Sequence, residues 1–167
     1  MAIEILPFSK EFDRQDFDCG TPELNRYLQE HLSQDVKRFY ATVFLAVDHE
    51  TKKIAGYYTL ASASVDLSSL PQELTKKLPK YPVAPAIRLG RLAVDISAQG
   101  TGLGTKLMAD AVLRSISNVA GWAFLLVDAK DESAVRFYKK FGFAALSEDE
   151  KHLFMMRRSI MNFLDIA

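Results

Sequence analysis

Cysteine is almost absent from this sequence: Cys19 is the only one among 167 residues. An internal disulfide needs two cysteines and a multi-cysteine metal site needs more, so both are excluded. We expect no metal centre, and a fold held together by its apolar core. The shortage of cysteine fits a reducing compartment such as the cytoplasm.

Long apolar runs are also missing. No stretch approaches the roughly 18 apolar residues that a membrane-spanning helix requires. The first residues, Met1 to Pro7, lack a basic region and include the early acid Glu4, which is unlike a signal peptide. We therefore expect a cytoplasmic protein with no membrane partner.

The sequence also lacks an excess of charge of either sign, because its 21 Lys and Arg residues balance its 21 Asp and Glu residues. Taken over the whole chain, this argues against a nucleic-acid binder. The two charges are not balanced in one stretch: residues 71–94 hold five basic residues and one acid. Such a stretch is either a solvated charged face or a surface for an anionic partner.

The length and the hydrophobic pattern predict one domain over residues 1–167. A chain of this size buries roughly 70% of its unfolded surface. The pattern predicts strands at 3–6, 39–48, 54–64, 87–95, 123–127 and 153–156, and helices at 22–38, 102–119 and 132–140. One short helix is expected inside a proline-rich insertion at 66–86. Antiparallel strands followed by a strand–helix–strand–helix–strand unit indicate an α/β fold, a mixed sheet with helices on both faces.

The segment from Arg88 to Leu107 carries the clearest chemical signal. An apolar strand enters a glycine-rich turn that opens a helix. Helix starts present unpaired backbone N–H groups and a partial positive charge, and so suit a phosphate or pyrophosphate. Glycines at 100, 102 and 104 let the backbone close on an anion without Cβ clashes.

Three cofactor patterns compete for this turn. The Rossmann fingerprint fails because Thr105 stands where its third glycine belongs, and the P-loop fails because Leu107 follows Lys106. The pattern Q-x-x-G-x-G is met in full by Gln99, Gly102 and Gly104. A structural turn is the plain alternative, which the preceding strand and the following amphipathic helix disfavour. Here the chain resembles the GNAT N-acetyltransferase superfamily, whose loop for the pyrophosphate of acetyl-coenzyme A has this form.

The resemblance implies the GNAT fold, a central, mostly antiparallel mixed sheet with a splayed central strand, and acetyl-coenzyme A as cosubstrate. It implies that the strand before the loop pairs with the pantetheine arm and polarises the acetyl carbonyl, typically the largest catalytic effect in acyl transfer. The cofactor-binding residues that it implies are Leu92, Ala93, Val94, Gln99, Gly100, Thr101, Gly102, Leu103, Gly104, Thr105, Asp131, Ser133 and Phe137.

A second match to the family, A-x-x-F-Y-x-x-x-G-F, runs from Ala134 to Phe143. It implies that Tyr138 protonates the departing thiolate, since a phenol of pKa near 10 keeps its proton at neutral pH. The alternatives to these functional roles are structural: Tyr138 could be an aromatic residue on the helix face, and Phe137 could pack in the core. Gly142 most simply caps the helix.

The sequence pattern does not indicate any histidine as a general base. His31, His49 and His152 lie outside both motifs, and each is interpreted as a surface or packing residue. A free α-amine has a pKa near 8 and is partly neutral without a base, whereas a lysine side chain near 10.4 needs more help. The acceptor is therefore expected to be an α-amine.

A narrower resemblance is to the GNAT toxins of bacterial toxin–antitoxin pairs. It is carried by Phe17 to Gly20, Leu24 to Leu28, Ile54 to Leu60, Leu78 to Pro82 and Leu89 to Asp95. It implies acetylation of the α-amine of aminoacyl-transfer RNA, neutralisation by a ribbon-helix-helix antitoxin, and a homodimer.

A transfer RNA substrate needs local phosphate contacts on a chain of zero net charge. The candidates are Lys80, Arg88, Arg91, Arg136, Lys139 and Lys140. One alternative is a GNAT enzyme that acts on a small amine or a protein N-terminus. The other is a non-catalytic acetyl-coenzyme A-binding module, which the presence of Tyr138 disfavours.

Overall fold

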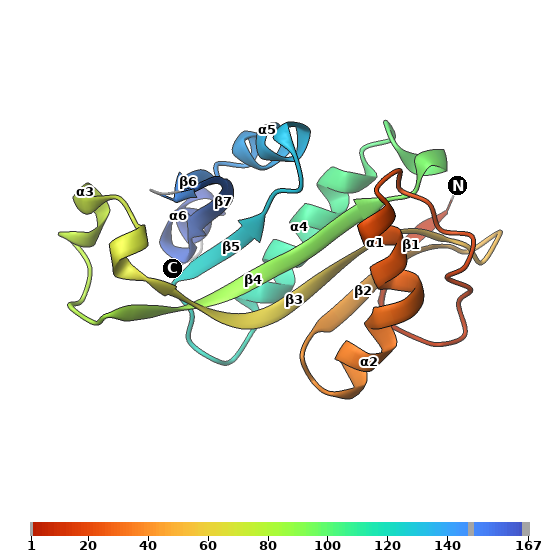
Figure 1. The fold of residues 1–167 in the computed structure, drawn as a ribbon, viewed down its shortest axis with the longest axis horizontal. Coiled ribbons are helices and arrows are strands. Elements are labelled where there is room, and N and C mark those ends of the chain that lie inside the picture. Colours follow the sequence, from red (N-terminus) through yellow and green to blue (C-terminus); the bar gives the residue numbers. More distant parts are fainter. Residues whose placement is uncertain (1, 147–148, 165–167) are drawn as a thin grey trace. The chain divides into compact units, whose positions relative to one another are not determined.

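The computed structural model describes residues 2–146 and 149–164 and falls into two compact units (Figure 1). Unit 1 comprises Met1–Ala61 and Gly90–Ser117, and unit 2 comprises Ser62–Leu89 and Asn118–Ala167. Strands β3 (Ile54–Asp66) and β4 (Val83–Val94) run through both units. The strand order of the sheet is β1-β2-β3-β4-β5-β7-β6. A mixed, mostly antiparallel sheet with helices is confirmed.

The sheet of unit 1 begins with two antiparallel ladders. Strand β1 (Ile3–Pro7) pairs with β2 (Thr42–Asp48), and β2 pairs with β3 through a hairpin. Residues Val43 to Val47 of β2 are all buried, which explains why this strand is a continuous apolar run rather than an alternating one.

The predicted helix at 22–38 is present as three joined pieces: α1 (Pro22–Arg26), a π-helical turn η1 (Tyr27–His31) and α2 (Leu32–Lys37). Pro22 stands at the first helical position, but the side chain of Thr21 makes no capping hydrogen bond. Phe39 adopts the left-handed conformation with φ 63° and is exposed. The strand predicted from Phe39 therefore begins only at Thr42, because this turn stands between helix and strand.

Helices cover both faces of the unit 1 sheet, as two adjacent tyrosines of β3 show. Tyr57 lies in the core beside α1 and η1 and donates its hydroxyl hydrogen to the carbonyl of Leu24 at 2.8 Å. Tyr58 points to the other face and donates to Asp110 on α4 (Leu103–Ile116) at 2.5 Å. Neighbouring side chains on a strand point to opposite faces, so the pair places one helical layer on each side.

Unit 2 is built on the first part of β4 with β5 (Phe124–Asp128), β7 (Asp149–Met156) and β6 (Ala144–Leu146). The β4–β5 ladder is parallel and runs from Ala86↔Phe124 to Leu89↔Val127. Strands β5 and β7, and β7 and β6, are antiparallel. The predicted last strand, 153–156, is thus longer than expected, while β6 and α6 (Arg157–Phe163) were not predicted.

The proline-rich segment after β3 covers the core of unit 2. It contains the 3-10 turn η2 (Leu67–Ser69) and α3 (Gln72–Thr75), which confirms the expected short helix. Leu70, Leu74 and Leu78 pack with the buried strand residues Val65, Ala86, Phe124, Leu126 and Phe154. The predicted insertion extended too far, to residue 86. Strand β4 already starts at Val83. Pro85 lies within it, because a proline lacks a backbone N–H but its carbonyl can still accept a hydrogen bond, here from the N–H of Ala123 at 2.9 Å.

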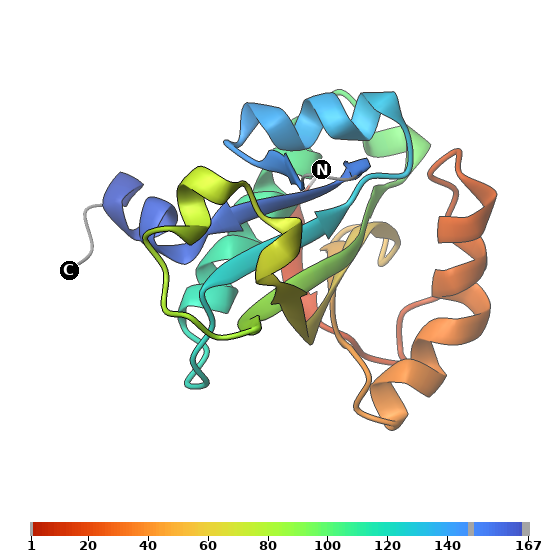
Figure 2. The same cartoon turned by 60° about the vertical axis from the view of Figure 1, so that its left-hand side comes forward.

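Helix α5 (Glu132–Lys140), at the predicted 132–140, packs against β7 (Figure 2). Within the described ranges, no helix combines the length and the apolar character that crossing a bilayer would demand.

Candidate functional site

The glycine-rich turn of unit 1 connects β4 to α4 through the 3-10 turn η3 (Ile96–Ala98). Gly100 and Gly102 have φ of 79° and 86°, a left-handed conformation that strains other residues. Gly102 is the N-cap of α4 and has no side chain to cover the N–H groups of the first helical turn. These groups, with the positive end of the helix dipole, form a site suited to phosphate.

Two polar side chains of this turn are used to build it. The Gln99 amide donates to the carbonyl of Cys19 at 3.0 Å and to that of Val94 at 2.9 Å. The Thr101 hydroxyl donates to the carbonyl of Ala98 at 2.6 Å. Both donor hydrogens of Gln99 are therefore engaged within the protein, which leaves the backbone of the turn to contact a ligand.

The segment Phe17 to Gly20 is fastened to the same turn. The Asp18 N–H donates to Asp95 at 2.8 Å, and the Ile96 N–H donates to the Asp18 carbonyl at 2.8 Å. Burial alone would raise the pKa of Asp95, but hydrogen bonds from the Asp18 N–H and from Ser97 outweigh it and leave the pKa below its ordinary value. The structure thus gives a physical role to a motif that sequence reasoning noted only as a resemblance.

The strand before the turn lies close to its neighbours in unit 1. A Cβ on Gly56 of β3 would stand 2.9 Å from the carbonyl oxygen of Ala93 and 2.9 Å from Cδ1 of Leu107, so glycine is required there. Ala93 is buried, while Leu92 and Val94 are partly exposed. Within unit 2 the β4–β5 ladder runs as far as Leu89, and Leu92 to Val94 follow on the part of β4 that belongs to unit 1.

Arg91 packs on the face of Tyr27, with its guanidinium carbon 3.6 Å from the ring centroid. The Tyr27 hydroxyl donates to Asp35 at 2.8 Å. Burial and this hydrogen bond raise the pKa of Tyr27 to about 12. The π-helical turn that begins at Tyr27 therefore holds a cationic side chain of β4 against an aromatic face.

In unit 2, Tyr138 lies on α5 and is only 5% exposed. Its ring packs edge-on against Phe137 and Phe143 at 5.3 and 5.7 Å between centroids. Burial, and then the negative charge of Asp128, raise the pKa of the Tyr138 phenol well above its ordinary value. The hydroxyl consequently keeps its proton at neutral pH, as a general acid must.

Two other predicted residues define the start of α5. Asp131 is its N-cap and accepts the N–H of Ala134 at 2.9 Å, while Ser133 is exposed in the first turn. Phe137 is partly exposed and packs on Phe141 as well as Tyr138. Packing and ligand contact are both compatible with that exposure.

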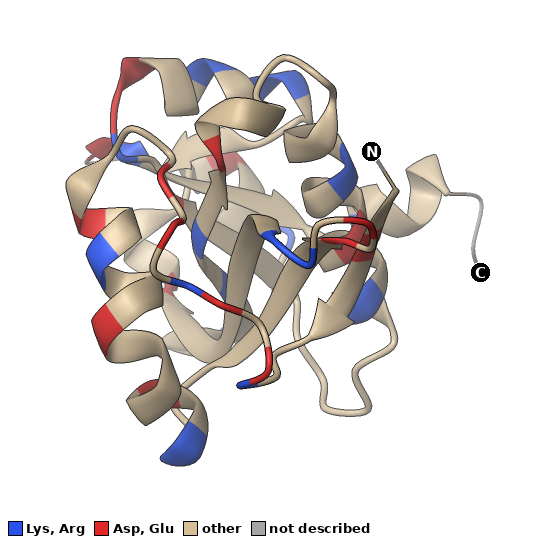
Figure 3. Cartoon of the chain, turned by 90° about the vertical axis from the view of Figure 1, so that its right-hand side faces the viewer, with Lys and Arg blue, Asp and Glu red and all other residues tan. Residues whose placement is uncertain are grey.

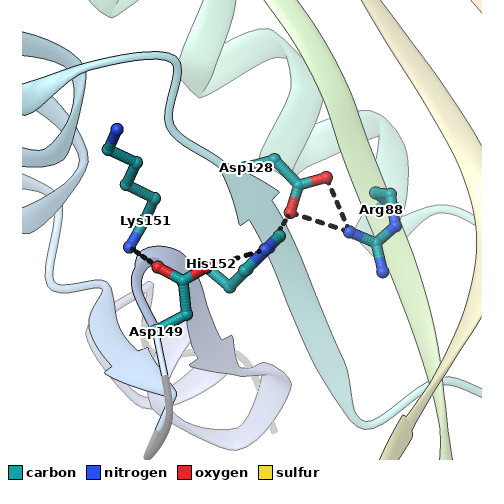
Figure 4. Close-up of polar contacts among 5 residues, drawn as sticks. All are labelled: Arg88, Asp128, Asp149, Lys151 and His152. Atoms are coloured by element: carbon teal, nitrogen blue, oxygen red, sulfur yellow. Dashed lines mark hydrogen bonds and ion pairs between the residues drawn. The ribbon is translucent and has the colours of Figure 1, made fainter.

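A polar cluster that the sequence did not predict lies on β4, β5 and β7 (Figure 4). Nη1 of Arg88 contacts both carboxylate oxygens of Asp128, at 2.9 and 2.8 Å. Nδ1 of His152 lies 2.6 Å from Asp128, and its Nε2 lies 3.2 Å from Asp149. The interpretation of His152 as a surface or packing residue did not include these partners, because Asp128 is distant in sequence and comes beside His152 only through the β5–β7 ladder.

The predicted phosphate-contacting residues do not share one environment. Arg88 is paired with Asp128 and Arg91 is packed on Tyr27, whereas Lys80, Arg136, Lys139 and Lys140 are exposed in unit 2. Figure 3 shows charges of both signs along the ribbon. The exposed lysines and Arg136 are thus the best candidates for an anionic partner.

Comparison with known proteins decides the family. The family profile described as "Acetyltransferase (GNAT) domain" matches residues 25–153. The chain belongs to the GNAT acetyltransferase family. Among curated proteins, this GNAT chain is similar to a "tRNA-acetylating toxin" of Mycobacterium tuberculosis, with 32% identity over 148 residues, 87% of each chain.

Two solved GNAT toxin structures also resemble it. "AtaT complexed with acetyl-methionyl-tRNAfMet" has 36% identity and a TM-score of 0.85 over 98% of each chain. A tyrosine-to-phenylalanine mutant of AtaT, bound to the C-terminus of the antitoxin AtaR and acetyl-CoA, has 30% identity and a TM-score of 0.80 over 97% of this chain and 98% of that one. The expected fold and the expected N-acetyltransferase class are confirmed.

Proposed function

We propose that this GNAT enzyme transfers the acetyl group of acetyl-coenzyme A to the α-amine of an aminoacyl-transfer RNA and so acts as a toxin that blocks translation. The observation that carries the proposal is similarity along nearly the whole chain to a protein named as a tRNA-acetylating toxin and to AtaT, which has been solved in complex with acetyl-methionyl-tRNAfMet.

The turn from Gln99 to Gly104 supports the donor half of the reaction. Its glycines and the uncapped start of α4 suit the pyrophosphate of acetyl-coenzyme A, and AtaT has been solved with that molecule bound. In the proposed complex, backbone groups of Leu92, Ala93 and Val94 hold the pantetheine arm and polarise the acetyl carbonyl. Asp131, Ser133 and Phe137 complete the cofactor contacts.

Tyr138 supports the transfer step. The amine nitrogen attacks the acetyl carbonyl carbon, an N–C bond forms, the C–S bond breaks, and the sulfur takes the phenolic proton. The nitrogen releases one proton, and the Tyr138 phenolate takes one back from water. A phenol of ordinary pKa near 10 already carries its proton at neutral pH, and burial raises the pKa of Tyr138 further.

A transfer RNA substrate is compatible with a net charge of zero because only a local surface has to contact phosphates. Lys80, Arg136, Lys139 and Lys140 are exposed in unit 2 and supply it. In this proposal Arg88 and Arg91, which are held by Asp128 and Tyr27, contribute less.

An antitoxin partner follows from the same relatives, since AtaT has been solved with its antitoxin AtaR. We propose a ribbon-helix-helix protein encoded beside this chain and a cytoplasmic site of action, where charged transfer RNA is found.

The test is label transfer from acetyl-coenzyme A by the purified protein to four acceptors: charged transfer RNA, the same RNA after deacylation, free amino acids, and a peptide with a free N-terminus. The proposal predicts label only in the charged RNA. Equal labelling of the amino acids or the peptide would overturn the substrate assignment and favour the small-amine alternative. No labelling of any acceptor would favour a non-catalytic binding module.

A further inference from the structure

The apolar face of the unit 2 sheet ends in a polar row. Ala86, Leu126 and Phe154 are buried in the core on β4, β5 and β7. Side chains two positions apart on a strand share a face, and the next residues on this face are Arg88, Asp128 and His152. The three strands therefore bring a guanidinium, a carboxylate and an imidazole together at the carboxyl end of β5.

Asp128 is the centre of this row. It is contacted by Arg88 from one side and by His152 from the other, which fixes the plane of its carboxylate (Figure 4). An ionised carboxylate has about four acceptor sites. Among the described residues, Oδ2 is contacted by Arg88 alone, and the side chain is 37% exposed, so a further donor from outside has room to bind.

The row lies next to the proposed general acid. Helix α5 packs against β7, the strand of His152, and residues 129–131 lead directly from Asp128 into α5. Burial raises the pKa of the Tyr138 phenol first, and the negative charge of Asp128 adds to the rise. The attacking nitrogen approaches the acetyl carbonyl carbon to about 3–3.5 Å, and the departing sulfur is bonded to that same carbon. A group that acts on the nitrogen must therefore stand near Tyr138.

We propose that Asp128 binds the acceptor amine, with Arg88 and His152 as positioning residues that hold its carboxylate; this rests on the proposed transfer to an α-amine. The carboxylate accepts an N–H of the amine and orients the nitrogen lone pair toward the acetyl carbonyl. The nitrogen gains positive charge as the N–C bond forms, and the fixed negative charge of Asp128 stabilises it. As the C–S bond breaks and Tyr138 protonates the sulfur, the nitrogen loses a proton to Asp128, which passes it to water; Tyr138 is reprotonated from water.

The pairing predicts a pH signature. A carboxylate next to an amine favours the ammonium form and raises the pKa of the amine, by about 1–3 units at close range. Only the free amine attacks, so the rate climbs with pH through that pKa. Arg88 on β4 and His152 on β7 contact Asp128, and the charge of Asp128 also acts on Tyr138 of α5. All three side chains are retained when Asp128 is replaced by the isosteric Asn. Asp128→Asn should thus lower the plateau rate and move the rising limb to lower pH.

The experiment measures kcat at saturating bulk charged transfer RNA from pH 5.5 to 9, because kcat reports the pKa values of the bound complex, with calorimetry of acetyl-coenzyme A binding. For Asp128→Asn we expect a plateau about 10²-fold lower, a limb shifted about one unit to lower pH, and unchanged acetyl-coenzyme A affinity. Asp149→Asn, which removes the outer carboxylate from His152, is the matched control and should change the plateau less than about 3-fold. A wild-type plateau, an unshifted limb, or equal losses in both variants would overturn the role of Asp128.

Asp128→Glu keeps the negative charge and tests the role of Asp128 in binding the amine if Asp128→Asn does not fold. It should retain the wild-type limb and lower kcat, because the longer side chain displaces the carboxylate; unchanged kcat would overturn the proposal. Failure of the proposed function is a separate result, since the wild type would then transfer no acetyl group to charged RNA.

Discussion

Gln99 shows why a motif residue need not touch the ligand that the motif serves. Its amide joins the carbonyls of Cys19 and Val94, which fixes both the N-terminal segment and the end of β4. The glycines after it provide the left-handed backbone that a side chain would strain. The sequence pattern predicts a phosphate-binding loop, while the hydrogen bonds that build this loop are visible only in three dimensions.

At Tyr138, replacement by phenylalanine should lower acetyl transfer by about 10²–10⁴-fold, the usual contribution of a positioned general acid. The ring and its contacts with Phe137 and Phe143 remain, so thermal stability and acetyl-coenzyme A affinity should not change. Steady-state kinetics beside calorimetry checks both halves. Near-normal rates would mean that the hydroxyl is structural and that another group or water protonates the thiolate.

At Lys139, an exposed residue of α5, charge reversal to Glu should weaken binding of charged transfer RNA about 10-fold and make it less sensitive to salt, because a phosphate contact is lost. Acetyl-coenzyme A affinity should stay the same. The control is Lys10→Glu, an equal change of charge in unit 1. If both variants bind the RNA like the wild type at every salt concentration, α5 is not part of the RNA surface.

Among the elements, the turn and the start of α4 are tested by Gly102→Asp. It strains a φ of 86° and places a negative charge at the start of the helix, so acetyl-coenzyme A affinity should fall at least about 100-fold. Gly142→Asp introduces the same side chain at φ 100° beyond α5 and serves as the control for strain. If calorimetry finds normal acetyl-coenzyme A affinity in folded Gly102→Asp, the assignment of the phosphate site to this turn is wrong.

The connection of β4 to the Phe17–Gly20 segment is tested through Asp95. Its pKa is below the ordinary 3.8, so its stabilising contribution is fully present above that pH and is lost as pH falls through the native pKa. Asp95→Asn should cost about 1 kcal/mol at pH 7, the scale of one or two exposed hydrogen bonds. Urea titrations should show the difference from wild type shrinking below pH 3.8. A difference that is constant down to pH 2 would contradict this.

Helices and buried strands were predictable where the periodicity is long, as at 132–140, while short or irregular elements were not. Strand β6 has three residues, too few for a pattern. The π-helical turn at Tyr27 has a helical apolar spacing and only its hydrogen bonding differs. Because β7 was predicted to begin at residue 153, the pairing of His152 with Asp128 was out of reach. If the strand had been predicted to begin one residue earlier, at His152, the pairing of His152 with Asp128 could have been predicted as well.

For the whole molecule, the single domain over residues 1–167 stays a prediction, and the structure describes two compact units whose boundaries fall within β3 and β4. The motifs divide between them: the glycine-rich turn belongs to unit 1, and Tyr138 with the Asp128 row belongs to unit 2. Two local sequence patterns therefore predicted the parts of the candidate site, while the hydrogen bonds and packing that support each part required the structure.

The assembly expected from the toxin resemblance is a homodimer. Sedimentation at micromolar concentration should give about twice the chain mass of 18.7 kDa. A species of one chain mass across that concentration range would contradict it.

The central claim is that an acetyl group moves from acetyl-coenzyme A to the α-nitrogen of an aminoacyl-transfer RNA. The direct measurement is mass spectrometry of aminoacyl-adenosine released by nuclease from charged RNA after reaction with the wild type and with Tyr138→Phe. We predict acetyl on the α-nitrogen with the wild type, and at least about 100-fold less product with Tyr138→Phe. Acetyl on the RNA bases, on a side-chain amine, or on no part of the aminoacyl-adenosine would contradict the account.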